Sequence, residues 1–391
     1  MGTDNMRVDQ LWAIEDLNRT RQIRLNQMFG ITHELKFERN KNGITRATQG
    51  AHYPEDTQYR RFASLSEAYI EFSGDPSIQH LGRNVRAQQV AALASFEMAL
   101  ANVCNRLLIQ DFATEYRWRD IVTSITGPQD FRPNVRTRIK YVPDLPDLTE
   151  DQPYTDNEPP PSDDESFSYT VNQKGKFFSF SRRVVVNDDI GLIKRAVEQL
   201  GRAAWRTLAK RVWNLLIANA DYGVDGVPMF DATHGNLGSA ALSTEGLTTA
   251  RQAIFAQCEP NSTERLGLGG GPLLLAVPIQ LEETALTLNV AQFIDPDLNP
   301  NPWLHRFGPE SERIFANPLF TDANDWYLFD ISGKAGIIEV GFLMGRQDPE
   351  VIQSSPYTDS EFFQDRVTYK LRHEYECAIV DYRGAYKSVV A

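Results

Sequence analysis

The sequence predicts an α+β protein of several domains, built around a pair of long strands and one long helix. Three observations predict this class. Hydrophobic and polar residues alternate in two stretches, 135–142 and 167–186, as expected for strands that bury one face. A proline-free pattern with helical period then runs from about residue 187 to 219. Beyond residue 221, short helical and strand patterns are interleaved, which indicates a mixed body of helices and strands.

Length and composition are those of a protein that folds. The chain has 391 residues, of which 41% are hydrophobic and 10% aromatic, enough to bury a core. Apolar runs such as 272–278 are much shorter than the roughly 20 residues that span a bilayer, and the N-terminus has no apolar signal core. We therefore expect no membrane segment and a cytoplasmic location. Cys104, Cys258 and Cys377 form no CxxC pair and are expected to be buried thiols.

The charge balance argues against a protein whose main task is to read DNA. The formal net charge is −12, whereas phosphate binding needs a local excess of Lys and Arg. Acidity of this size is compatible with a concentrated soluble protein, because self-repulsion opposes indiscriminate association.

The first third of the chain predicts two helices separated by a weakly patterned stretch. Residues 1–30 have helical spacing and a basic cluster at Arg19, Arg21 and Arg24, which favours either a surface helix or a segment that binds a scaffold or faces a lumen. Residues 31–86 are mixed and polar, as in an extended arm. Residues 87–115 lack Gly and Pro and carry a broad apolar face, so they predict a strong helix.

The two alternating stretches predict the strands of a long hairpin, and an unusual segment lies between them. Residues 144–165 contain nine Asp or Glu, several prolines and no Lys or Arg. Such a segment cannot bury enough apolar surface to fold alone. We expect either a solvated loop or a segment that is ordered by a basic partner.

The long helix predicted at 187–219 begins with the capping residues Asn187, Asp188 and Asp189. Its apolar positions form one broad stripe, and charged residues recur every fourth position on another side. The members of this basic ridge are Lys194, Arg202, Arg206 and Lys210, with Glu198 between the first two. Two interpretations stay open, a solvated helix face and a docking ridge for an acidic partner.

Beyond residue 221 the chain predicts two further helices and several short strands. The helices are expected at 244–257 and 280–288. The strands are expected at 273–277, 326–330, 337–343, 367–373 and 376–381.

The sequence shows little that predicts catalysis or cofactor binding. The glycine-rich run 267–272 precedes a strand, has Pro272 at the third glycine position, and is therefore not a nucleotide loop. His373, Tyr375 and Cys377 alternate as on a strand, and no second His has ligand spacing. No GxSxG motif is present, although a triad can be assembled from distant positions. We expect no cofactor, no metal and no catalytic residue.

Several stretches, taken in order, resemble the Mu-like major head subunit family of the Hong Kong 97 fold. They are Phe177–Asp189, Leu200–Ala204, Leu273–Pro278, Trp326–Phe329, Gly345–Pro349 and Val367–Lys387. The resemblance covers roughly residues 88–391 and is weaker before them. It implies a capsid fold with an N-terminal arm, an extended hairpin called the E-loop, a spine helix, a peripheral domain and an axial domain.

The domain boundaries that the resemblance implies run in chain order. We expect an arm at 1–87, a helix leading into the peripheral domain at 88–125, the E-loop at 126–186, the spine helix at 187–220, the axial domain mainly at 221–330, peripheral strands at 331–370, and a C-terminal axial segment at 371–391. Some members of this fold crosslink their subunits through lysine. Lys174 and Lys176 lie in the expected hairpin, but no motif identifies an acceptor.

The implied function is that of a major capsid protein, not an enzyme. Its copies would form pentamers and hexamers of an icosahedral phage head around double-stranded DNA, which the protein would contact only non-specifically. Scaffold, portal and decoration proteins are possible partners, a membrane is not, and the virion would be assembled in the bacterial cytoplasm. The alternatives are an encapsulin-like compartment shell of the same fold and a hydrolase with dispersed catalytic residues.

We expect the acidic segment of one subunit to meet the basic ridge of a neighbour, because uncompensated carboxylates gain order by approaching positive charge. The contact candidates are Asp144, Asp147, Glu150, Asp151, Asp163, Asp164, Glu165, Lys194, Arg202, Arg206 and Lys210.

Overall fold

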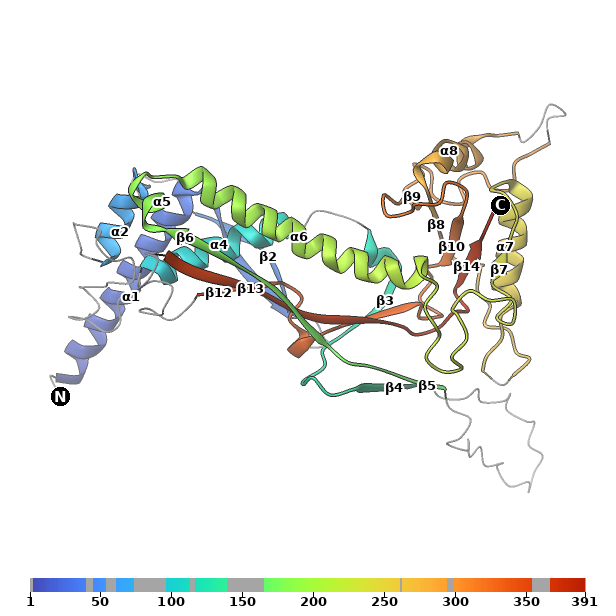
Figure 1. The fold of residues 1–391 in the computed structure, drawn as a ribbon, viewed down its shortest axis with the longest axis horizontal. Coiled ribbons are helices and arrows are strands. Elements are labelled where there is room, and N and C mark those ends of the chain that lie inside the picture. The colour runs from blue at the N-terminus through green and yellow to red at the C-terminus, as the bar shows by residue number, and fades with distance from the viewer. Residues whose placement is uncertain are drawn as a thin grey trace, which may run out of the picture. The chain divides into compact units, whose positions relative to one another are not determined.

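A computed structural model confirms the α+β class. It describes residues 3–39, 45–53, 61–73, 96–112, 117–138, 165–260, 262–293, 299–353 and 366–390 (Figure 1). The chain divides into two compact units. Unit 1 comprises 1–114, 172–207 and 344–375, and unit 2 comprises 115–171, 208–343 and 376–391. Two continuous elements, helix α6 (Ile190–Ile217) and strand β13 (Arg366–Ile379), contribute residues to both units.

Unit 1 has a helical core rich in aromatic side chains. Its other helices are α1 (Thr3–Met28), α2 (Leu65–Ser73), α4 (Phe96–Phe112) and α5 (Arg182–Val186). Phe72 and Phe96 lie with ring centroids 6.3 Å apart, and Tyr69 meets Phe96 edge-on at 5.4 Å. All three rings are buried, and such pairs add about 0.5–1.5 kcal/mol beyond the area they bury.

The C-terminal part of α1 belongs to this core. Leu25 and Phe29 are buried, and the Arg24 guanidinium lies 4.0 Å from the centroid of the Phe62 ring. Arg24 also pairs with Glu71 of α2 at 2.9 Å. Of the basic cluster in the sequence, Arg21 and Arg24 therefore hold α1 to α2 within the same chain, while Arg19 pairs with Glu34 of β1.

The strands of unit 1 form a small hairpin and part of a larger sheet. The hairpin is β1 (His33–Arg39) with β2 (Thr45–His52). In the sheet, β13 pairs antiparallel with β6 (Asn172–Ser181) on one side and with β12 (Glu350–Gln353) on the other. The Phe178 and Tyr369 rings stack across the first pair with centroids 5.3 Å apart. Each side of β13 is thus covered by a partner strand.

Unit 2 contains a five-stranded sheet in the order β7-β14-β10-β8-β9. These strands are β7 (Leu237–Gly238), β8 (Leu273–Val277), β9 (Ile314–Ala316), β10 (Trp326–Asp330) and β14 (Ala385–Ser388). Helices α7 (Thr244–Ala256) and α8 (Glu282–Val290) supply side chains to the core on this sheet, which includes Leu275, Trp326 and Leu328. On β10 and β9, Phe329 and Phe315 pack against Trp213 of α6.

The rest of unit 2 contains the hairpin. Strands β4 (Asn134–Arg138) and β5 (Glu165–Tyr169) pair antiparallel, from Asn134 opposite Tyr169 to Arg138 opposite Glu165. Strand β3 (Val122–Thr126) runs parallel to β11 (Ile338–Phe342). Three short 3₁₀ turns complete the described elements, η1 (Trp118–Asp120), η3 (Ile279–Leu281) and η4 (Leu343–Gly345).

Most elements lie where the sequence pattern predicts them. Strands β8 and β10 match the predicted bounds, as do α6, α7 and β11 to within a few residues. The helix predicted at 87–115 is present as α4, while its first residues, 87–95, lie outside the described part. Of the three cysteines, Cys104 and Cys377 are buried as expected and Cys258 is half-buried.

Two strand predictions are wrong. Residues 167–186 were expected as one hairpin strand, but β5 ends at Tyr169, β6 pairs with β13 instead of β4, and residues 182–186 form helix α5. Val185 of α5 is buried and its carbonyl accepts a hydrogen bond from Ser66 of α2, so tertiary packing outweighs the strand preference of three consecutive valines.

The strands predicted at 367–373 and 376–381 are one continuous strand, β13. The alternation of buried and exposed positions stops near Tyr375 because β13 changes partners there. Its first part pairs with β6 and β12, and its last part adjoins β11. Tyr375, Glu376 and Cys377 are consequently buried in succession.

Residues 31–86 contain more structure than an arm. Besides β1 and β2, they form α2, which begins with a reciprocal cap: the Ser64 hydroxyl accepts from the Glu67 N–H, and the Glu67 carboxylate accepts from the Ala63 N–H. Asp188 was expected to cap α6, but its carboxylate accepts the N–H of Leu65 at the start of α2.

The buried imidazole of His373 predicts a dependence of unfolding on pH. Burial lowers its pKa to about 4, while Nε2 lies 2.9 Å from the carbonyl oxygen of Gln347. The unfolded chain therefore binds a proton between about pH 6.5 and 4 that the folded chain does not. The contribution of His373 to the free energy of unfolding is therefore fully present above pH 6.5. It is lost as the pH drops from 6.5 to 4, by about 3 kcal/mol in total.

A His373→Gln variant keeps an N–H donor for Gln347 but does not titrate. Its free energy of unfolding, measured in urea at pH 7, 5 and 4, should fall less steeply with pH than that of the parent chain. His305→Gln, at an exposed histidine, is the control and should follow the parent. Equal pH slopes in the parent and His373→Gln would contradict this account.

Candidate functional site

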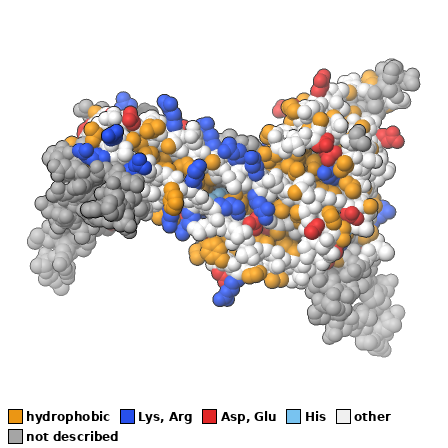
Figure 2. Space-filling view, viewed as in Figure 1, with side chains coloured by type: hydrophobic (Ala, Val, Ile, Leu, Met, Phe, Trp, Pro, Cys, Tyr) orange, Lys and Arg blue, Asp and Glu red, His pale blue; other side chains and the backbone are white. Residues whose placement is uncertain are grey.

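The basic ridge predicted on the long helix is an exposed feature of α6. Arg202, Arg206 and Lys210 are exposed, and Lys194 is half-exposed with its Nζ 4.0 Å from Glu198. Figure 2 shows Lys and Arg side chains following this helix. On the other side of α6 the side chains are buried, so the helix has one face for the core and one charged face for solvent or a partner.

The acidic half of the predicted contact lies almost wholly outside the described residues. This applies to Asp144, Asp147, Glu150, Asp151, Asp163 and Asp164. Because Arg138 and Glu165 are directly paired, residues 139–164 connect the two strands of the β4–β5 hairpin. Glu165 is the one member of the acidic set whose contacts are described.

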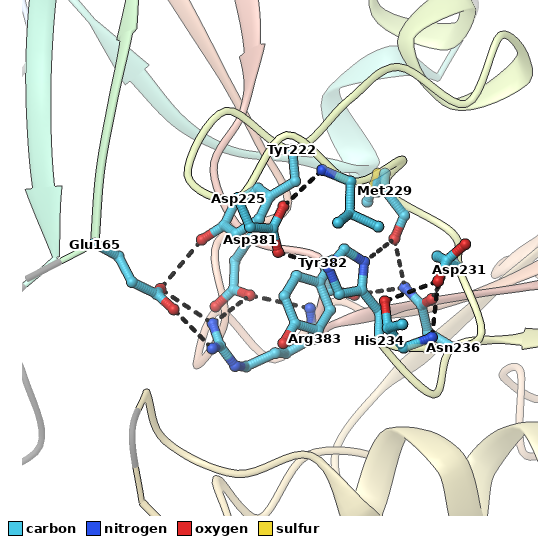
Figure 3. Close-up of polar contacts among 12 residues, drawn as sticks. Glu165, Tyr222, Asp225, Met229, Asp231, His234, Asn236, Asp381, Tyr382 and Arg383 are labelled. Carbon is cyan, nitrogen blue, oxygen red and sulfur yellow. Dashed lines mark hydrogen bonds and ion pairs between the residues drawn. The ribbon is translucent and has the colours of Figure 1, made fainter. Parts of the chain in front are cut away.

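Glu165 is engaged within its own chain. Its carboxylate accepts two hydrogen bonds from Arg383, at 2.8 and 3.2 Å, and one from the Tyr222 hydroxyl at 3.1 Å (Figure 3). Arg383 also pairs with Asp381 at 3.1 Å. Burial lowers the pKa of Arg383, but its hydrogen bond to Glu165 and the nearby Tyr382, Glu165 and Tyr222 raise that pKa above its ordinary value. Glu165 therefore anchors the end of the acidic segment to unit 2.

A buried histidine extends this cluster. His234 places Nε2 2.9 Å from the Asp225 carboxylate and Nδ1 3.1 Å from the Met229 carbonyl, and its ring stacks on Tyr382 with centroids 3.8 Å apart (Figure 3). Burial raises the pKa of Asp225, but hydrogen bonds from His234 and the Val227 N–H lower it overall. These bonds fix the loop after α6 against the segment before β14.

The base of the β4–β5 hairpin is held by a buried carboxylate, Glu339 of β11. It accepts hydrogen bonds from Tyr169 of β5 at 2.6 Å and from Arg136 of β4 at 3.1 Å. Ser124 and Thr126 of β3 each donate to it at 3.0 Å. One side chain, only 5% exposed, thus joins four strands.

The Tyr169 hydroxyl of the hairpin is closely surrounded by Glu339 and Gly341 of β11. Burial and the bond to Glu339 raise the pKa of Tyr169 to about 12, so its hydroxyl remains a donor. Gly341 lies beside the same hydroxyl, and any Cβ there would be 2.5 Å from it. A larger residue at Gly341 would displace Tyr169 from the network.

The described residues show neither a metal-binding cluster nor a membrane-spanning helix. In the described ranges, no group of three or more His, Cys, Asp and Glu lies close enough to hold a metal ion. None of the helices in the described part of the chain is long and apolar enough to cross a membrane. The glycine-rich run 267–272 is a loop before β8, and His373 lies on a strand, as the sequence predicts.

Sequence reasoning missed the carboxylate network around Glu339. A signal was present, because a lone acid in the apolar strand Ile338–Phe342 is expected to be buried and therefore to need partners. The partners themselves, Arg136 and Tyr169, come from distant parts of the chain and could not be assigned from spacing.

Comparison with known proteins gives one family match. A family described as phage capsid protein matches residues 164–388, more than half of the chain. No curated protein matches the sequence.

Solved structures resemble the chain at low sequence identity. A structure from Mycobacterium phage Patience is 13% identical, with a TM-score of 0.44 over 75% of this chain and 88% of that one. The capsid of a native GTA particle is 11% identical, with a TM-score of 0.43 over 71% and 90%. The procapsid of bacteriophage JBD30 is 14% identical, with a TM-score of 0.38 over 74% and 75%.

Removing the Glu339 carboxylate should destabilise unit 2. Glu339→Ala leaves the buried Tyr169 hydroxyl and the hydroxyls of Ser124 and Thr126 without their shared acceptor, whereas Arg136 is 41% exposed and can be hydrated. A buried donor left unsatisfied costs about 1–3 kcal/mol. Urea unfolding measures this loss, and proteolysis within residues 134–169 should become faster.

The matched control is Glu350→Ala, because Glu350 pairs with Arg346 and Arg372 at a partly exposed position of unit 1. An exposed pair contributes about 0–1 kcal/mol, so this variant should stay close to the parent. If Glu339→Ala were no less stable than Glu350→Ala, the network would not hold the hairpin.

Proposed function

The chain belongs to the phage capsid protein family and is a phage major capsid protein, and on this premise we propose that its copies form the pentamers and hexamers of an icosahedral head around double-stranded DNA. The observation that carries the proposal is the family match over residues 164–388. The role is structural and not catalytic. An encapsulin-like compartment and a hydrolase are not favoured.

The order of the elements supports this role. Hairpin β4–β5, helix α6 and the sheet-based body of unit 2 follow one another as the Hong Kong 97-type fold implies. Homo-oligomeric assembly is what a capsid protein does, since a shell consists of many copies. We propose in addition that the copies form pentamers and hexamers, and that they assemble with scaffold, portal or decoration proteins.

The hairpin gives a physical reason for assembly. Among the described residues, β4 and β5 form a two-stranded sheet by themselves, and such a sheet is marginally stable alone. Val135 of β4 is 63% exposed and Phe131 before it is 49% exposed. A neighbouring copy that covers these apolar side chains would stabilise both the hairpin and the contact.

We further propose that the acidic segment of one subunit meets the α6 ridge of another. The segment connects the two strands of an anchored hairpin, because Glu165 and Glu339 fix its end and its base. The ridge offers Arg206 and Lys210 as exposed cations, with Arg202 and Lys194 on the same helix. A single exposed pair contributes about 0–1 kcal/mol, but a shell repeats the contact many times.

Charge reversal on the ridge tests this contact. A variant with Arg202→Glu and Arg206→Glu should form far fewer shells at low salt, as measured by light scattering and electron microscopy, while its melting temperature stays near that of the parent. Because salt screens such contacts, parent shells should weaken toward 1 M salt, where the Debye length is about 3 Å. Replacing the segment's acids by Asn and Gln should weaken shells less than reversal does.

A control with the same change of net charge is Arg366→Glu with Lys370→Glu, at exposed positions of β13. It should assemble better than the ridge variant. Normal assembly of the ridge variant at low salt would refute the pairing, whereas a parent chain that never assembled would refute the proposed function itself.

A further inference from the structure

Three arginines line one pocket of unit 2. The pocket has a volume of about 620 Å³ and lies between α7 and the loop that carries Trp303 and Arg306. Arg251 reaches it from α7, and Arg265 from the loop after α7. None of the motifs found in the sequence includes these three arginines.

The charged side chains that line the pocket, among the described residues, are all arginines. None of the described residues that line it is Asp or Glu. Arg251 uses its Nε to donate to the Gly269 carbonyl at 2.8 Å, and the Arg265 guanidinium lies 5.5 Å from the centroid of the exposed Phe255 ring. In the described part of the chain, none of the three arginines has an ion-pair partner.

A fourth arginine raises the local charge. Arg313 donates to the carbonyl of Arg306 at 3.2 Å, and its Nε is buried without a hydrogen-bond partner among the described residues. Burial, followed by the like charges of Arg251 and Arg313, lowers the pKa of Arg306. Like charges held this close repel one another, so an anion in the pocket would relieve an unfavourable interaction.

We propose that this pocket binds a small oligophosphate anion through Arg251, Arg265 and Arg306. Three guanidinium groups around one small volume match phosphate groups that are joined in a short chain, and each guanidinium can donate two parallel hydrogen bonds to phosphate oxygens. The exposed ring of Phe255 adds an apolar wall, on which a planar group attached to the phosphates can stack.

The size of the pocket favours a small ligand. Its volume falls in the range of about 300–1,000 Å³ that is usual for small-molecule sites. A DNA duplex is convex and would reach such a hollow with only a few backbone phosphates. The chemistry recognised is phosphate in either case, and its source is a free oligophosphate or nucleotide in preference to nucleic acid.

Titration calorimetry on the purified full-length chain, with inorganic tripolyphosphate as the probe, tests the proposal. Saturable binding is expected at physiological salt. A variant with Arg265→Gln and Arg306→Gln should bind at least about tenfold more weakly, and Arg306→Lys, which keeps the charge but loses the planar fork, should lie between. Thermal melting without ligand verifies that each variant folds. If the double variant does not fold, the affinity of Arg306→Lys for tripolyphosphate decides the test.

The matched control is Arg366→Gln with Lys370→Gln, which changes the net charge equally but lies at exposed positions of β13. This control should keep the affinity of the parent. ATP and a short DNA duplex, titrated separately, distinguish the source: tighter binding of the duplex, lost in the pocket variant, would assign nucleic-acid phosphates. The proposal is overturned if tripolyphosphate shows no saturable binding, or if the control loses as much affinity as the pocket variant.

Discussion

The buried carboxylate of Glu339 is the interaction on which the rest of the hairpin depends. Phe167 and Tyr169 of β5 pack in a small apolar cluster with Val171 and Leu343, while the Glu339 network joins both strands of the β4–β5 hairpin to β3 and β11. Tyr169 and Arg136, one from each strand, meet at this single acceptor. A charged acceptor is suited to this place because bonds to an ionised group are roughly twice as strong as neutral ones. Because the acidic segment connects β4 to β5, the Glu339 network fixes the place from which this segment can reach another subunit.

The distribution of charge gives the molecule its second organising feature. The chain is acidic overall, yet its cations gather along α6 and in the arginine pocket, while nine acids gather within 144–165. This separation of charge along the sequence is what the proposed contact between the acidic segment and the α6 ridge rests on. If the proposed ridge contact forms, we expect assembly to weaken as salt rises.

The sequence predicted those elements whose local pattern agrees with their final environment. Helix α6 and strands β8 and β10 have one clear period and lie close to their predicted bounds. The three valines of α5 were misassigned because contact with α2 decides their conformation, which local preference cannot reveal. Helix α2 was missed although Ser64 and Glu67 form a recognisable cap. The partners of Glu339 were unpredictable, since hydrogen bonds between residues up to 215 positions apart leave no trace in spacing.

Electron microscopy of the expressed chain shows directly whether its copies close into shells. We expect closed shells in which each β4–β5 hairpin lies on a neighbouring subunit, with density for residues 144–164 against the α6 ridge of another copy. A compact monomer at every protein and salt concentration, also with a scaffold present, would contradict the account of this chain as a shell subunit. Shells in which the segment touches only solvent would retain the function and remove the proposed contact.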